Sequence, residues 1–232
     1  IKQIRNVFVK IDKTPNILSL KFTPTGHNLL PDNTTLDVSS YKEAMKTSPF
    51  ARDLFIVDGV SNVFLTNEYV SVTIDDSSKW ADIQGEIVSK INEYIISGKA
   101  ILEDNFDIYA NEIEYDDDDE VVAIIRELID TRIRPNVQYD GGDVIYRGFE
   151  HDTGIVKLEL VGACKGCSSS SETLHNGIER MLQFYVPEVQ GVLQVESDEA
   201  KRLEQINKDA FDAVQQKLSS KQSDDDSNND SS

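Results

Sequence analysis

The two cysteines of this 232-residue chain, Cys164 and Cys167, stand three positions apart in the stretch GACKGCSSS (residues 162–170). Thiolates are nucleophiles and soft metal ligands, so the pair has three interpretations: a dithiol redox centre, half of a metal site, or two inert thiols. The stretch lies between a predicted strand and a predicted helix, and a helix N-terminus favours the thiolate form. That position suits the redox and the metal interpretations equally.

The neighbours of the cysteines favour metal. Gly162, Ala163 and Gly166 remove side chains from the loop and leave room for an object larger than a bare ion. A redox centre usually follows a thioredoxin-like βαβ layout, whereas a helix and a hairpin are predicted before this motif. Thiolate sites select zinc, copper(I) or iron–sulfur clusters, and the four-coordinate options need about four protein ligands.

One chain supplies two sulfurs, so two further ligands are needed. His151 and His175 are candidates, although each is more often an ordinary surface or packing histidine, and His27 belongs to another predicted domain. Two chains related by a two-fold axis would instead combine two cysteine pairs into one site. A site shared in this way could release what it holds.

The hydrophobic pattern predicts an α+β fold with two small α/β domains. Residues 1–102 form the first: a hairpin of 7–11 and 17–22, strands 60–65 and 69–74, and helices 48–54 and 80–96. Ile83, Ile87, Ile91 and Ile95 share one face of the last helix. The phenylalanines are predicted to be core residues: Phe8, Phe22, Phe50, Phe55 and Phe64.

Residues 103–119 are predicted to be an acidic linker. Their stretch NEIEYDDDDE (111–120) carries adjacent carboxylates without the spaced ligands and turn glycine of a calcium loop. A second domain is predicted to span 120–196, and its first helix, 120–134, is predicted to stop at Pro135.

The rest of that domain places the C-x-x-C at a strand-to-helix turn. Strands 144–149 and 155–161 form a hairpin, a helix begins directly after Cys167 with Ser169 and Glu172 as a capping box, and a last strand covers 189–195. The segment DGGD (140–143) is predicted to be a structural turn rather than a ligand set. Residues 197–218 are predicted to be an amphipathic helix and 219–232 a disordered tail.

Composition limits the partners. A formal charge of −19 would repel a phosphate backbone, so nucleic acid is not expected. No apolar run approaches the roughly 20 residues of a membrane span, so no membrane is expected either. The start at Ile1 suggests a trimmed precursor whose targeting segment is not visible, and two close cysteines indicate a reducing compartment.

Two long stretches resemble a known family. IRPNVQYDGGDV (133–144) and GACKGCSSSSETLHNGIERMLQFYVPEVQGVLQV (162–195) resemble the C-terminal domain of NifU and of the Nfu iron–sulfur cluster carriers. The first hundred residues resemble the N-terminal domain of mitochondrial Nfu proteins through TPN (14–16), LKF (20–22), SPFARDLFIVDGVSNVF (48–64), SVT (71–73) and SGKAIL (97–102).

The resemblance implies a scaffold or carrier, not an enzyme. It would assemble or receive a [4Fe–4S] cluster bridged between two protomers by Cys164 and Cys167, forming a homodimer on loading. The resemblance also implies upstream cluster-assembly proteins as partners, recipient apoproteins such as lipoyl synthase and respiratory-complex proteins, and a mitochondrial matrix location. One departure is Ser168, where the family commonly has proline.

Two alternatives stay open. The same thiols would serve a dithiol oxidoreductase that cycles an intramolecular disulfide in a monomer. The first predicted domain, which has no cysteine, would suit a module that recognises partners or controls cluster release.

Overall fold

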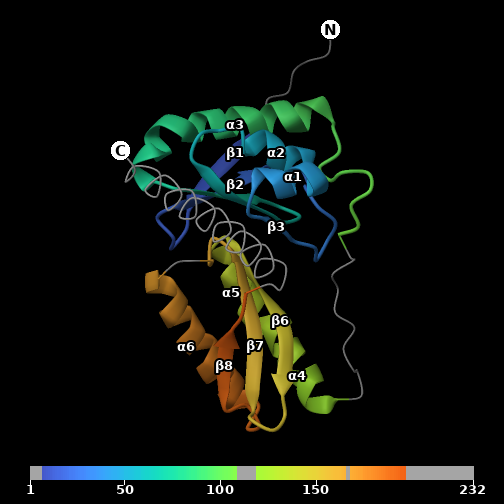
Figure 1. The fold of residues 1–232 in the computed structure, drawn as a ribbon, viewed down its shortest axis with the longest axis vertical. Helices are drawn as coiled ribbons and strands as arrows, with labels where there is room; N and C mark the ends of the chain where they lie inside the picture. The colour runs from blue at the N-terminus through green and yellow to red at the C-terminus, as the bar shows by residue number, and fades with distance from the viewer. Residues whose placement is uncertain (1–6, 109–118, 166–167, 197–232) are drawn as a thin grey trace, which may run out of the picture. The chain divides into compact units, whose positions relative to one another are not determined.

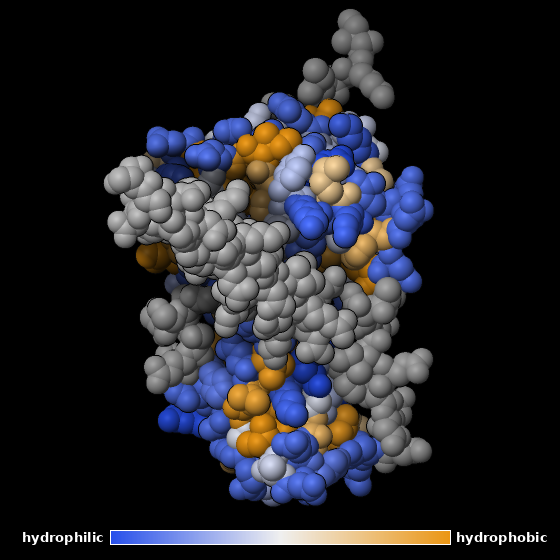
Figure 2. Space-filling model, in the orientation of Figure 1, coloured by the Kyte–Doolittle hydropathy of each residue, from blue (hydrophilic) through white to orange (hydrophobic). Residues whose placement is uncertain are grey.

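A computed structural model describes residues 7–108, 119–165 and 168–196 of the chain. Contacts divide the chain into one compact unit that ends at Gln194 and a second that begins at Val195, and all the described helices and strands lie in the first. Hydrophilic residues cover most of the described surface in the view of Figure 2. No helix in these ranges is both long enough and apolar enough to cross a membrane.

The first sheet is antiparallel, with five strands in the order β1-β2-β5-β4-β3. Its strands are β1 (Val9–Lys13), β2 (Ser19–Pro24), β3 (Leu36–Val38), β4 (Val60–Leu65) and β5 (Val70–Ile74). The predicted hairpin is therefore confirmed. Its turn is held by Asn16, whose Oδ1 accepts a hydrogen bond from the Leu18 amide at 3.0 Å.

Helices pack on this sheet, and α3 runs across it in Figure 1. They are α1 (Tyr41–Thr47), α2 (Pro49–Leu54), the 3₁₀ turn η1 (Ser77–Lys79) and α3 (Trp80–Ser97). Ser48 caps α2 by accepting from the Ala51 amide. The first core has these largest fully buried side chains: Phe22, Phe50, Leu54, Leu65, Ile74, Ile87 and Ile91.

Some features of this half differ from the prediction. Phe8 is 71% exposed rather than in the core. The chain also stays ordered past residue 102, because Phe106 and Ile108 pack against the first core and Arg52 pairs with Glu103 at 3.2 Å. Most of the predicted acidic linker, 109–118, lies outside the described residues.

The second sheet has three strands in the order β6-β7-β8. The strands β6 (Gly142–Glu150) and β7 (Ile155–Gly162) form the predicted antiparallel hairpin, and β8 (Gly191–Gln194) pairs with β7 in parallel. A parallel neighbour requires a crossover connection, which the helix α6 (Ser168–Tyr185) provides. The predicted helix start directly after Cys167 is confirmed, but the side chains of Ser169 and Glu172 lie outside the described residues, as do 197–232.

The prediction that Pro135 stops the preceding helix was wrong. The helix α4 (Glu120–Leu128) continues through the π-helical turn η2 (Ile129–Ile133) into α5 (Arg134–Tyr139). The amide of Arg134 donates to the carbonyl of Ile129, five residues back. Pro135 thus falls in the first turn of α5, where a missing N–H is tolerated.

The second core lies between this broken helix, α6 and one face of the second sheet. Its largest fully buried side chains are Ile125, Ile129, Leu158 and Leu182. Asp119 caps α4 by accepting from the amides of Val121 and Val122, so the end of the acidic segment starts this helix.

Candidate metal centre

Cys164 lies in the turn that follows β7, here called the cysteine turn (residues 162–165). Two backbone hydrogen bonds hold this turn: Ala163 donates to the Gly141 carbonyl at 3.2 Å and Lys165 to the Gly162 carbonyl at 3.1 Å. The Cys164 side chain is buried, with 7% of the residue exposed, and packs in the second core. Cys167 lies outside the described residues, one position before the start of α6.

Glycines make the space that Cys164 occupies. A β-carbon on Gly142 would lie 2.7 Å from the Cys164 Sγ and 2.5 Å from the Val161 carbonyl oxygen. Gly162 has a φ of +67°, which disfavours other residues, and a β-carbon there would meet the Phe64 ring at 2.7 Å. Of the small residues named in the sequence analysis, Gly162 is thus required by packing, whereas Gly166 lies outside the described residues.

Side chains of the first sheet bind the backbone around Cys164. Asn16 donates from Nδ2 to the Ala163 carbonyl at 3.1 Å. Ser71 donates to the Gly141 carbonyl at 2.7 Å. All the atoms in both bonds are buried, so each bond satisfies a carbonyl that water does not reach.

Two more residues of the first sheet act at the same place. Tyr69 donates from its hydroxyl to the Gly142 carbonyl at 3.2 Å, and burial, followed by the nearby Asp143 carboxylate, raises the pKa of this phenol. Asp37 accepts from the Gly162 amide at 3.4 Å and lies 3.4 Å from the ammonium of Lys165.

The DGGD segment (140–143) forms the turn from α5 into β6, as predicted. Its last residue, Asp143, is 3% exposed and accepts from Arg134 Nε at 3.1 Å and from the Val144 amide at 2.8 Å. Burial raises the pKa of Asp143, against the opposing attraction of Arg134. Gly141 has a φ of +86°, which the turn from α5 into β6 requires.

A mainly apolar cavity of about 510 Å³ lies beside Cys164. It is lined by Pro15, Asn16, Ile133, Asn136, Asp140, Ala163, Cys164, Leu174, Gly177, Ile178 and Met181. The cysteine thus faces a space between α5, α6 and the turn of the first hairpin. Burial in this region raises the pKa of Asp140, with Lys21 opposing the shift.

His151 is not placed to share a ligand site with Cys164. It follows β6, whose Glu150 pairs with Ile155, while Gly142 pairs with Gly162 at the opposite end of the hairpin. Eight residues of strand separate these ends by about 25 Å. His151 instead lies 2.6 Å from an Asp119 carboxylate oxygen and contacts the Phe149 ring edge-on. His175 is half-buried on α6 and is not among the described residues that line the cavity beside Cys164.

Sequence reasoning did not assign Asn16, Tyr69 or Ser71 to this site, because they come from a sheet more than 60 residues away in the chain. A signal was present. TPN (14–16) and SVT (71–73), two of the short segments shared with the Nfu family, contain Asn16 and Ser71.

Comparisons with known proteins cover both halves of the chain. A family model described as the NifU-like domain matches residues 125–193, and one described as the scaffold protein Nfu/NifU N-terminal matches residues 9–98. The human protein named NFU1 iron-sulfur cluster scaffold homolog, mitochondrial, is 45% identical over 198 residues, which are 85% of this chain and 75% of that protein.

Other relatives agree. A NifU-like protein of Schizosaccharomyces pombe is 40% identical over 198 residues, covering 84% of this chain and 75% of the relative. A solution structure of a NifU-like protein from Saccharomyces cerevisiae overlaps 45% of this chain and 92% of that one at 20% identity, with a TM-score of 0.40, which is too low to support a statement about the fold.

The two matches, in this order along the chain, define an α+β protein of the scaffold class. The chain belongs to the Nfu family of iron–sulfur cluster scaffolds, as the resemblance predicted.

Proposed function

We propose that Cys164 and Cys167 of two chains together hold one [4Fe–4S] cluster, which the protein then passes to recipient apoproteins. The cluster is cargo in this proposal, and the loaded state is a homodimer. The observation that carries it is that each chain has two cysteines, three positions apart at the junction of β7 and α6, while a cubane cluster takes four thiolates.

The surroundings of Cys164 support a cluster more than a bare ion. A glycine turn brings backbone close to the sulfur, and the adjoining cavity has mostly apolar walls. Such surroundings exclude water and shield a cluster from loss and oxidation. Transfer then needs only ligand exchange: recipient thiolates replace the four scaffold thiolates on iron, and no electron is gained or lost.

We further propose the following division of labour along the chain. Residues 1–102 form an Nfu N-terminal-like domain and 103–119 an acidic linker whose first residues, up to Ile108, pack on the first core. Residues 120–196 form the NifU-like cluster-binding domain, 197–218 a C-terminal helix and 219–232 a tail. The mitochondrial matrix is the proposed location, in keeping with the names of several relatives. Upstream cluster-assembly proteins would supply the cluster, and lipoyl synthase and respiratory-complex proteins are the proposed kind of recipient.

The experiment is anaerobic reconstitution of the full chain with iron and sulfide, followed by size-exclusion chromatography, iron and sulfide analysis, and Mössbauer spectroscopy. The expected result is a dimer that holds one cubane cluster, lost in Cys164→Ala and in Cys167→Ala. Ser61→Ala is a suitable control, because Ser61 is exposed on β4 and bonds only to the Thr73 carbonyl among the contacts described. A monomer that takes up no iron, or only zinc, would overturn the proposal.

The dithiol oxidoreductase remains the alternative for the same pair. It predicts turnover in an insulin disulfide-reduction assay by a monomer that binds no cluster. The family membership favours the scaffold, because the relatives are named as scaffold proteins.

A further inference from the structure

We propose that the first sheet is a clamp on the cysteine turn. When the clamp is closed, Cys164 is withheld from a second chain, and its release is the step that admits a bridging cluster. This inference rests on the proposed function of Cys164, and it assigns a regulatory role to the half of the chain that has no cysteine.

The clamp consists of polar side chains that hold backbone carbonyls on both sides of Cys164. Ser71 and Tyr69, at β5, donate to the carbonyls of Gly141 and Gly142, the residues against which the cysteine turn packs. Ser71 is fully buried and Tyr69 is 5% exposed, so these are internal contacts rather than surface encounters. Their geometry fixes the wall behind the cysteine.

Asn16 closes the arrangement from the other side. Its amide donates to the carbonyl of Ala163, the residue before Cys164, and with Pro15 it lines the cavity that adjoins the sulfur. Its remaining acceptor bonds the Leu18 amide, so the side chain is held in place. The hairpin turn therefore forms part of the wall of the cysteine cavity.

The closed arrangement conflicts with bridging. A cluster shared by two chains must touch thiolates from both, yet Cys164 is only 7% exposed, and Pro15 and Asn16 of the first hairpin turn line the cavity that adjoins it. Movement of Asn16 and Pro15 away from the turn would open the cavity on the side that they line. Loading thus requires the clamp to open, and a closed clamp disfavours loading.

The clamp can open without unfolding either half. The first core and the second core are separate clusters with no residue in common. Among the described residues, a small apolar cluster lies where the two sheets meet: Phe64 and Tyr69 from the first half, Val161 and Ile145 from the second. A contact that is mostly polar and carries a small apolar patch is typical of surfaces that separate and rejoin.

The direct test measures how accessible the Cys164 thiol is in the apo protein. Asn16→Asp keeps the acceptor for Leu18 and replaces the donor to Ala163 with an anion that repels the carbonyl. We expect alkylation of Cys164 by iodoacetamide in the full chain to become about tenfold faster, as measured by mass spectrometry of tryptic peptides, because cleavage after Lys165 separates Cys164 from Cys167. Asn92→Asp is the matched control, because the Asn92 amide donates to the Val88 carbonyl within α3.

A second variant guards against a fold defect in the first. Tyr69→Phe combined with Ser71→Ala removes two clamp bonds without adding charge, and it is used if Asn16→Asp loses its far-UV circular dichroism or the amide protection of α3. The clamp is overturned if the folded variant alkylates Cys164 within about twofold of wild type.

Cluster uptake by wild type separates the two proposals. Faster alkylation in the variants with no iron uptake by any of the proteins would support the clamp and refute the proposed function. Cluster binding by wild type with no change in alkylation in the variants would support the proposed function and refute the clamp. If the proposed function and the clamp are both correct, the clamp variants should also load a cluster faster than wild type and the Asn92→Asp control.

Discussion

The Cys164 sulfur lies so close to Gly142 that a β-carbon added at position 142 would be 2.7 Å from it. The relationship predicts that Gly142→Ala is destabilising, because the added carbon also meets the rigid Val161 carbonyl oxygen at 2.5 Å. We expect a loss of about 1–3 kcal/mol in the free energy of unfolding, measured by urea denaturation.

Gly85→Ala is the matched control for that substitution. Gly85 lies within α3, and its β-carbon would meet nothing within 4 Å. Alanine is the better helix former by about 0.5–1 kcal/mol, so this variant should be more stable than wild type. Equal stability of the two alanine variants would contradict the packing argument at Cys164.

The buried Asp143 carboxyl predicts a pH dependence. Its pKa in the folded protein lies above the ordinary value of 3.8, because burial outweighs the attraction of Arg134. The folded state therefore binds more protons than the unfolded state in the window just above pH 3.8, and stability contributed by Asp143 is lost as pH rises through that window.

The measurement compares the free energy of unfolding of wild type and Asp143→Asn at several pH values. Because asparagine does not titrate, the stability of wild type relative to the variant should fall as the pH rises above 3.8. A difference that grows in favour of wild type over this range would show that Arg134 outweighs burial.

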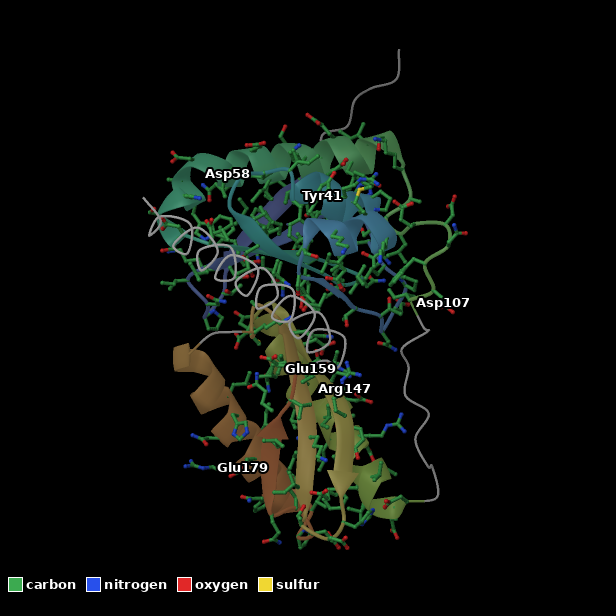
Figure 3. The ribbon with its side chains drawn as sticks, viewed as in Figure 1. Tyr41, Asp58, Asp107, Arg147, Glu159 and Glu179 are labelled. Atoms are coloured by element: carbon green, nitrogen blue, oxygen red, sulfur yellow. The ribbon has the colours of Figure 1, made fainter. Side chains whose placement is uncertain are left out.

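A second buried carboxylate lies on the neighbouring strand. Glu159, on β7, has 7% of its side chain exposed and accepts from the Nε of Arg147 at 2.8 Å and from its Nη2 at 2.5 Å. Figure 3 labels the two side chains on adjacent strands. Arg147→Ala leaves the carboxylate buried without its cation, and we expect a loss of about 3 kcal/mol.

The double variant Arg147→Ala with Glu159→Gln should recover part of that loss, because the amide carries no charge that needs a partner. Urea denaturation of the wild type, both single variants and the double variant gives the coupling energy. Strict additivity of the two substitutions would mean that the pair does not interact in solution.

Ser168 stands at the first residue of α6, where the sequence resemblance led us to expect proline. Proline suits this position, since the first helical N–H has no partner in the helix and the ring fixes φ. Ser168→Pro should stiffen the segment after Cys167 and slow the loss of a bound cluster to a chelator, by about threefold. Ser168→Ala is the matched control, because it removes the same hydroxyl without fixing φ. Equal rates for the alanine and proline variants would remove the stiffness argument.

Periodicity predicted most of the fold. The alternation in β2 and β7 and the isoleucine spacing in α3 each reflect a single buried face, and these elements lie where they were expected. The short elements were missed: β3 has three residues, and α1 has seven, too few to show a period. Pro135 misled because the preceding π turn leads into a new helical turn, whose first positions tolerate a missing N–H.

The sequence predicted the C-x-x-C motif as the candidate site, but not which residues of the first half contact the turn that carries Cys164. Spacing and small neighbours pointed to Cys164 and Cys167 and to glycines around them. The contacts from Asn16, Tyr69 and Ser71 depend on two sheets meeting, which no local pattern encodes. Both cysteines remain predicted ligands: the structure describes the surroundings of Cys164, and Cys167 lies outside the described residues.

The π turn at Ile129–Ile133 also sets the rotation of α5 about the helix axis. It adds one residue to the helix, and one residue corresponds to about 100° of rotation around the axis. Deleting a residue there would restore a regular helix but turn α5 by that angle, carrying the buried Val137 out of the core and Asn136 away from the cavity. In this stretch, the count of residues is therefore more constrained than their chemical identity.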